Sequence, residues 1–411
     1  MSNSSILVVG GGFSGITAAL EAAEVGHEVF IVEKTPFLGG RVAQLNKYFP
    51  KLCPPSCGLE IQFQRIKNNK NVKFFTQAEV GGIKGSKGDY EVTVKIKPRH
   101  VGPGSAQLTE VAEGLEKDVT NEFEFGLSKR KALHLDMPFA FPQRWVLDKD
   151  ACTEADLKKL SELEVIDLEE TEREVTLNVG SIVYATGWKP YDMTNLTNLG
   201  GGQIPNMISN MQMERLASGS GPTKGNIVRP SDGEKPMNVA FVQCAGSRDE
   251  NHLGFCSYIC CMASLKQAAY LREQHPDCRV SIFYIDLRTP GRYDNFKNKI
   301  LDDPKIRAVK GKVADAQPAG DKVKLTVENA VTGIKGEETF DMVVLATGMQ
   351  PSLAGQKLPA GLEVDEEGFI IGGEDKGIYA AGCAKLPLDV MKSAQSATGA
   401  ALKAIQTVKG R

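Results

Sequence analysis

The sequence predicts an α/β fold with two Rossmann-like units. An apolar strand at 6–9 leads into a glycine-rich turn and a helix, and a second strand, helix and strand pattern begins near residue 239. Two more apolar strands each end in the tripeptide Ala-Thr-Gly, at 185–187 and at 346–348. Alternation of short apolar strands with helices is typical of a parallel sheet covered by helices.

The first unit has the spacing of a dinucleotide-binding turn, because Gly10, Gly12 and Gly15 form the pattern G-x-G-x-x-G. In this pattern the first glycine permits the tight turn and the second lets a pyrophosphate approach the backbone. The third lets the following helix, expected at 13–24, pack on the strand. Glu33 ends the next strand and is placed to accept hydrogen bonds from an adenosine ribose.

Composition limits the remaining function classes. The chain has 411 residues, more than one hydrophobic core usually serves, so we expect more than one domain. Its 49 basic and 51 acidic residues give a formal net charge of -2, which offers no electrostatic basis for binding nucleic acid. No apolar run approaches the ~20 residues of a membrane-spanning helix, and the amino terminus lacks a basic and apolar leader. We therefore expect a cytoplasmic protein without a membrane span of its own.

We expect the dinucleotide-binding domain to be divided by an insertion and by a second Rossmann-like domain. The alternating run 90–97 predicts an edge strand at the end of the first piece, and the Gly-, Pro- and Ser-rich stretch 200–232 predicts a linker. In the second domain we expect strands at 239–243 and 279–286 and a helix at 262–275. The predicted pieces are 1–97, 175–235 with the linker, and 348–411 for the first domain, 98–174 for the insertion, and 236–347 for the second domain.

Several segments resemble the flavoproteins with two dinucleotide-binding domains, the class of glutathione and thioredoxin reductases. These segments are Leu38 to Arg41, the two Ala-Thr-Gly strand ends, and Gly377 to Cys383. The resemblance implies FAD in the first site and a helix at 393–402 whose amino end faces the flavin. Cys383 stands where that class commonly has Asp, and it is either an inert buried residue or a catalytic candidate. The implied FAD-binding residues are Gly10, Gly12, Gly15, Glu33, Lys34, Gly39, Gly40, Arg41, Ala185, Thr186, Gly187, Gly382 and Cys383.

The second domain has cysteines where a second nucleotide site would have glycines. After Val242 the sequence continues as Cys244-Ala-Gly-Ser-Arg248, and five of the nine cysteines lie within 35 positions. Clustered cysteines in a reducing cytosol are more often metal ligands or redox groups than disulfides. Four thiolates, on Cys244, Cys256, Cys260 and Cys261, suit a 4Fe-4S cluster or zinc, and their spacing does not separate the two. Inert buried thiols are the third alternative, and the neighbouring flavin domain favours a redox cluster.

Segments 243–248, 255–268 and 381–389 resemble the A subunit of heterodisulfide reductase and its relatives, and the resemblance covers nearly the whole chain. It implies a 4Fe-4S cluster held by the four clustered cysteines. Near Cys152 the chain lacks the C-x-x-C-x-x-C run of those proteins, so no ferredoxin cluster is expected there. The short length and segment 50–58 resemble the A subunit of the quinone-interacting membrane-bound oxidoreductase of dissimilatory sulfate reducers.

Cys53 and Cys57 leave three alternatives. Disulfide reductases of this fold have a redox pair with four intervening residues, whereas here three intervene and two of them are proline. The pair is a redox dithiol, a ligand near a cluster or the flavin, or structural.

The resemblance implies an electron-transfer subunit of a larger complex. Its partners would be a membrane haem subunit and a sister subunit with flavin and iron-sulfur centres, together linking the menaquinone pool to adenylylsulfate reductase and attaching the chain peripherally to the membrane. The alternatives are a pyridine-nucleotide disulfide oxidoreductase that uses Cys53 and Cys57, and a non-catalytic scaffold with a zinc knot. The missing glycines after Val242 argue against the first of these.

Overall fold

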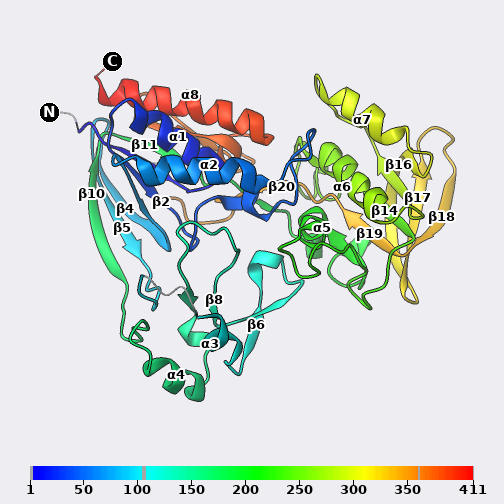
Figure 1. Cartoon of the computed structure of the whole chain (residues 1–411). Coiled ribbons are helices and arrows are strands. Elements are labelled where there is room, and N and C mark those ends of the chain that lie inside the picture. Colours follow the sequence, from blue (N-terminus) through cyan, green and yellow to red (C-terminus); the bar gives the residue numbers. More distant parts are fainter. Residues whose placement is uncertain (1–2, 104–107, 360–361, 411) are drawn as a thin grey trace. The chain divides into compact units, whose positions relative to one another are not determined.

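The chain folds into two units, each built around its own sheet (Figure 1). The computed structural model describes residues 3–103, 108–359 and 362–410. The first unit comprises 1–43, 56–188 and 351–411, and the second comprises 44–55 and 189–350. The predicted division at 235 and 347 remains a prediction. In the structure, segment 44–55 and the stretch expected to be a linker both group with the second unit.

A five-stranded parallel sheet forms the centre of the first unit, in the order β23-β11-β1-β2-β3. Its strands are short apolar runs without alternation because both faces of the sheet are covered. The strands are β1 (Ile6–Val9), β2 (Val29–Val32), β3 (Val72–Phe75), β11 (Ser181–Tyr184) and β23 (Ile378–Ala380).

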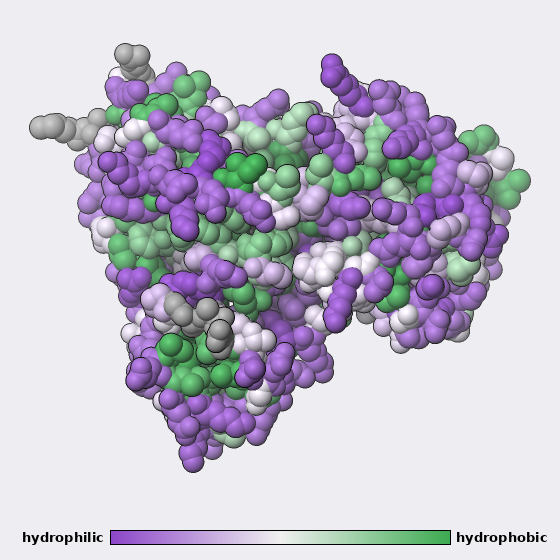
Figure 2. Space-filling model, viewed as in Figure 1, coloured by the Kyte–Doolittle hydropathy of each residue, from purple (hydrophilic) through white to green (hydrophobic). Residues whose placement is uncertain are grey.

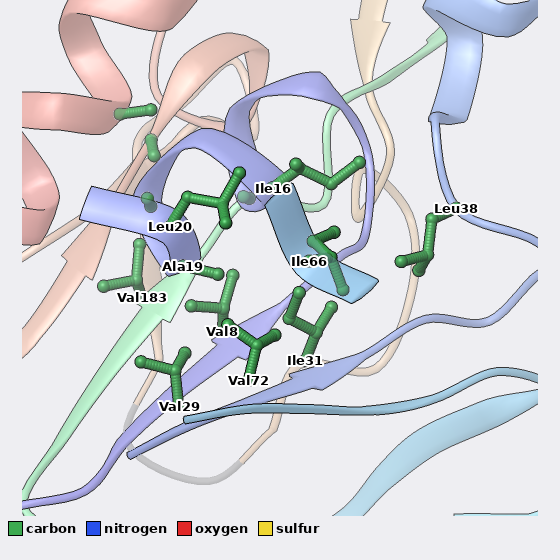
Figure 3. Packing of buried hydrophobic residues seen from close by; sticks show 14 of the residues in the cluster. Val8, Ile16, Ala19, Leu20, Val29, Ile31, Leu38, Ile66, Val72 and Val183 are labelled. Carbon is green, nitrogen blue, oxygen red and sulfur yellow. The ribbon is translucent and has the colours of Figure 1, made fainter. Parts of the chain in front are cut away.

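Helices cover one face of this sheet. Residues of α1 (Phe13–Glu24), α2 (Pro55–Asn68) and α8 (Val390–Val408) share one buried apolar cluster with the strands. In Figure 3, Val8 and Val183 of neighbouring strands point toward Leu20 of α1. The helix expected at 393–402 is part of α8, which is longer and begins after the Asp389 cap.

A three-stranded antiparallel sheet, in the order β10-β5-β4, packs on the other face. Its strands are β4 (Ala78–Ser86), β5 (Asp89–Ile96) and β10 (Arg173–Val179). The prediction that 90–97 is an edge strand is wrong, because β5 is paired on both sides. Alternation of apolar and polar residues indicates that one face of a strand is buried. It does not indicate whether the strand pairs on one side or on both. A small antiparallel pair, β21 (Glu363–Val364) and β22 (Ile370–Ile371), completes the unit.

The segment between β5 and β10 has its own small core, formed by residues such as Val101, Leu133 and Leu160. It contains short elements only, as expected for an insertion in a surface loop. These elements are α3 (Thr109–Glu113), β6 (Asp118–Thr120), β7 (Lys129–Lys131), β8 (Leu133–His134), β9 (Val146–Leu147) and α4 (Glu154–Ser161).

The second unit contains a seven-stranded sheet in the order β13-β19-β14-β15-β16-β17-β18. The strands are β13 (Met207–Ser209), β14 (Asn238–Val242), β15 (Arg279–Tyr284), β16 (Ile306–Ala319), β17 (Lys322–Asn329), β18 (Lys335–Phe340) and β19 (Met342–Leu345). The first five in this order are parallel, and β17 and β18 extend the sheet antiparallel. Its helices are α5 (Asn210–Ala217), α6 (Cys260–Gln274) and α7 (Tyr293–Leu301). Two short strands, β12 (Trp188–Pro190) and β20 (Met349–Pro351), pair where the chain passes between the units.

Hydrophilic side chains dominate the face drawn in Figure 2, and the apolar patches on it are small and separate. No helix among the described residues is both long and apolar enough to cross a membrane.

Candidate functional site

Two glycines of the first turn are required by the fold itself. Gly10 has φ +107°, and a Cβ there would lie 2.4 Å from the carbonyl oxygen of Ala185 on the neighbouring strand. A Cβ on Gly15 would lie 1.8 Å from the carbonyl oxygen of Gly10. The carboxyl ends of β1 and β11 and the first turn of α1 therefore approach one another too closely for a side chain at either position.

Gly12 is different, because a Cβ there would meet nothing nearer than the Cα of Gly40 at 3.7 Å. Gly187 in the first Ala-Thr-Gly tripeptide also has no atom within 4 Å of an added Cβ. The amino end of α1 has no side-chain cap, so its first N–H groups and positive dipole end are open to an anion. The turn thus leaves space at the backbone where a dinucleotide pyrophosphate fits.

Glu33 is buried beside this turn. One carboxylate oxygen accepts a hydrogen bond from the Gly11 N–H at 2.6 Å, and the other accepts from the N–H and hydroxyl of Thr35 at 2.8 and 2.9 Å. Burial raises the pKa of Glu33, and these hydrogen bonds oppose the rise. The side chain therefore fixes the glycine turn.

The predicted residues after β2 are divided between the interior and the surface. Gly39 and Gly40 lie against the turn, with Gly39 N–H donating to the Gly11 carbonyl at 2.8 Å. The Arg41 Nε donates to the Trp188 carbonyl at 3.2 Å, and its guanidinium lies over the Phe125 ring. Lys34 instead is 69% exposed and pairs with Glu79 at 3.6 Å.

The last predicted FAD-contacting residues lie between α1 and α8. A Cβ on Gly382 would lie 2.1 Å from Ser14 Oγ in the first turn of α1, and the Gly382 N–H donates to Ser396 Oγ of α8 at 3.1 Å. Cys383 is buried, and its thiol donates to the Leu388 carbonyl at 3.4 Å. Burial raises the pKa of this thiol.

The corresponding turn of the second unit, between β14 and α6, is longer than the turn between β1 and α1. Residues 243–259 separate β14 from α6, whereas only residues 10–12 separate β1 from α1. In this longer segment Ser247 Oγ lies 2.8 Å from Ser257 Oγ. A Cβ on Gly348 would lie 2.1 Å from Ser247 Oγ, so the space left open beside Gly187 in the first unit is filled here.

Four cysteines gather at the amino end of α6, which also has no side-chain cap. Cys260 and Cys261 are its first two residues, Cys244 follows β14 with φ 54°, and Cys256 accepts a hydrogen bond from the Tyr258 N–H at 3.4 Å. Burial is the main reason that the pKa values of Cys244, Cys260 and Cys261 are raised, to about 11 for Cys261. The other three cysteines add to the rise at Cys260, so the thiols lie within electrostatic range of one another.

Among the described residues, no group of three or more His, Cys, Asp and Glu side chains stands as closely as one metal ion requires. A four-iron cluster binds each thiolate to a different iron atom, so its ligands stand farther apart than the ligands of one zinc ion. Crowded thiols whose ionised forms repel one another fit a cationic centre placed between them. The donor set is therefore compatible with a cluster.

All nine cysteines are free thiols, and five of them are not members of this group. Cys53 is exposed in segment 44–55 of the second unit, and Cys57 is exposed in the first turn of α2. Cys278 is buried just before β15, and Cys152 lies partly buried in the insertion.

Sequence reasoning missed a charged pair beside the four cysteines. The guanidinium of Arg248 lies 3.1 Å from the carboxylate of Asp286 and within electrostatic range of the Cys244 thiol. The signature 243–248 contains Arg248, but Asp286 follows the next strand and only the fold brings it there.

Comparisons with known proteins agree with this geometry. The model of a family described as FAD dependent oxidoreductase matches residues 5–53. The thioredoxin reductases of T. acidophilum and Lactococcus lactis each superpose with a TM-score of 0.53, at 16% and 12% identity. The superpositions cover 99% of this chain and 97% and 100% of those chains. The fold is that of the flavoproteins with two dinucleotide-binding domains, as predicted.

Three curated relatives are similar to nearly the whole of this chain. The A subunit of the H2:CoB-CoM heterodisulfide, ferredoxin reductase of Methanothermobacter thermautotrophicus is 34% identical over 98% of this chain. One of the iron-sulfur A subunits of the CoB-CoM heterodisulfide reductase of Methanopyrus kandleri is 34% identical over 97%. A protein of Archaeoglobus profundus, named for its likeness to the A subunit of heterodisulfide reductase, is 33% identical over 98%. The chain is thus similar, over nearly its whole length, to the A subunits of heterodisulfide reductase and their relatives. It spans 64%, 63% and 66% of the lengths of these three relatives.

Proposed function

We propose that the chain is an oxidoreductase subunit that transfers electrons between FAD in the first unit and a 4Fe-4S cluster on Cys244, Cys256, Cys260 and Cys261 in the second. The observation that carries this proposal is the gathering of four thiols at the uncapped amino end of α6. In a nucleotide-binding unit that end would face phosphate. Bound FAD takes up electrons in pairs or singly, and a cluster carries them singly.

In this proposal the residues of the first unit bind and orient the flavin. The backbone of Gly10 to Gly15 and the amino end of α1 receive the pyrophosphate, and Glu33 receives the ribose. The segments that line the rest of the site are Gly39 to Arg41, Ala185 to Gly187, and Gly382 with Cys383.

We further propose that the protein works only within a complex. Its partners would be a membrane haem subunit and a sister subunit with flavin and iron-sulfur centres, linking the menaquinone pool to adenylylsulfate reductase in sulfate reduction. The chain would then be cytoplasmic and attached to the membrane through those partners. The resemblance of segment 50–58 supports this proposal, and so do relatives that are named as subunits of heterodisulfide reductases. Purification of a tagged chain with these subunits and quinone-dependent electron transfer by the complex would test it.

The cluster is tested by Cys260→Ala in anaerobically purified protein. We expect this variant to keep FAD and to lose most of about four iron atoms per chain, since each thiolate binds one iron of the cluster. Cys278→Ala is the matched control, because this buried thiol of the same unit donates to the Arg279 carbonyl and is not among the four. It should keep its iron. Zinc in place of iron in the unaltered protein, or full iron in Cys260→Ala, would contradict the proposal.

A further inference from the structure

Arg248 and Asp286 form a charged pair built into the rim of the four-cysteine site. Arg248 has φ 58°, and its N–H donates to the Phe255 carbonyl at 3.0 Å. Its guanidinium is 25% exposed and lies 3.1 Å from the Asp286 carboxylate. The backbone and the side chain of Arg248 are thus both held in place, which limits the entropy lost when it contacts a ligand.

Each member of the pair also lies near one of the four cysteines. The Cys261 thiol donates to the backbone carbonyl of Asp286 at 3.5 Å, and the Arg248 guanidinium lies within electrostatic range of the Cys244 thiol. Cys256, by comparison, accepts a hydrogen bond from a neutral backbone N–H, that of Tyr258. A positive charge therefore lies near Cys244, and water screens it only partly because the Arg248 side chain is largely buried.

We propose that Arg248, oriented by Asp286, sets the reduction potential of the metal centre held by these cysteines. Reduction adds one electron, and so one negative charge, to a centre that four thiolates already make negative. A fixed positive charge near the ligand sulfurs stabilises the reduced form more than the oxidised form, and so raises the potential. Arg248 is in this sense a positioning residue that acts through Cys244. The inference rests on the proposed cluster.

The test compares Arg248→Gln, Arg248→Lys and Asp286→Asn with the unaltered full chain. Each protein is purified anaerobically, its iron is measured, and it is titrated with dithionite, which supplies the electron, while the reduced centre is followed by electron paramagnetic resonance. We expect a more negative midpoint in Arg248→Gln and a smaller change in Arg248→Lys, which keeps the charge. Asp286→Asn should shift the midpoint in the positive direction, because it removes a negative charge and leaves the backbone carbonyl in place.

Arg279→Gln is the matched control. It removes the same charge at the opposite end of β15 from Asp286, and its midpoint should equal that of the unaltered chain. A purely structural role for the pair would lower the iron content and would not move the midpoints in opposite directions. If Arg248→Gln fails to bind iron, Arg248→Lys decides: a midpoint more negative than that of the unaltered chain supports the role of Arg248, and an unchanged midpoint overturns it.

The outcomes separate this inference from the proposed function. An iron-loaded Arg248→Gln protein with an unchanged midpoint would overturn the role of Arg248 and leave the cluster in place. An unaltered protein that binds zinc and no iron would overturn both.

Discussion

The three glycines of the first turn have two different physical roles. At Gly10 and Gly15 an added Cβ would collide with backbone oxygens 2.4 and 1.8 Å away, so the fold excludes a side chain. At Gly12 the nearest atom is 3.7 Å away, and the fold alone would accept alanine. The sequence pattern assigns the pyrophosphate to the second glycine, and the structure gives an independent reason for the same assignment.

Gly12→Ala should therefore weaken FAD binding, whereas Gly15→Ala should destabilise the fold. We expect Gly12→Ala to unfold at the same temperature as the unaltered protein when both lack flavin, and to bind FAD more weakly. Loss of one charge-assisted hydrogen bond, about 1.5–3 kcal/mol, corresponds to roughly 10- to 100-fold weaker binding. Gly15→Ala should unfold at a lower temperature even without flavin. Thermal unfolding of the flavin-free proteins and FAD titration measure both effects. Unchanged FAD affinity in Gly12→Ala would refute the assignment.

At the scale of elements, local patterns in the sequence predicted some of the helices and strands, chiefly those next to glycine turns or made of short apolar runs. Helix 13–24 has the predicted bounds, since the glycine turn marks its beginning directly. Pairing between distant segments was not predictable. The central position of β5 in its sheet depends on β10, which lies beyond the insertion. The four cysteines could be singled out by their clustering, whereas Asp286 could not, because no local pattern links it to Arg248.

A second unpredicted feature is a buried ionic network that joins α5, α6 and segment 44–55. The Lys266 ammonium lies 3.1 Å from the Glu214 carboxylate and donates to the Lys47 carbonyl at 2.6 Å. Glu214 also accepts from the Asn46 N–H at 2.9 Å, and both charged side chains are only 2% exposed. Burial lowers the pKa of Lys266, and Glu214 opposes this shift. The network thus anchors the segment that contains Cys53 to the helix that begins with Cys260.

Lys266→Met should release this segment. It leaves Glu214 as a buried, unpaired charge, which costs about 3–5 kcal/mol, and it removes the contact with the Lys47 carbonyl. We expect much faster trypsin cleavage after Lys51 and a lower denaturation midpoint of the second unit. Lys305→Met is the control, because its pair with Asp277 is 3.3 Å long and exposed. Its loss should cost about 0–1 kcal/mol. Equal cleavage rates in the two variants would show that the network does not hold the segment.

At the scale of the whole molecule, the two units share a Rossmann-like plan. They differ in the turn that joins β1 to α1 in the first unit and β14 to α6 in the second. In the first unit three residues join β1 to α1 and leave open space at Gly12 and Gly187. In the second unit residues 243–259 carry the cysteines, and the Ser247 and Ser257 hydroxyls fill the space at Gly348. A pyrophosphate needs close approach to backbone N–H groups at this place. We therefore expect one dinucleotide site, in the first unit, and we expect the second unit to hold thiols at the corresponding helix end.

This difference predicts that neither NADH nor NADPH reduces the flavin. When either is mixed anaerobically with the FAD-loaded chain, the flavin absorbance should stay unchanged over many minutes, because the hydride donor has no site in the second unit. Dithionite added afterwards should bleach the flavin at once, which shows that the cofactor is intact and reducible. The same experiment separates the electron-transfer subunit from a pyridine-nucleotide disulfide oxidoreductase that uses Cys53 and Cys57. Rapid and stoichiometric bleaching by NADH or NADPH would favour the oxidoreductase and would contradict the interpretation of the second turn.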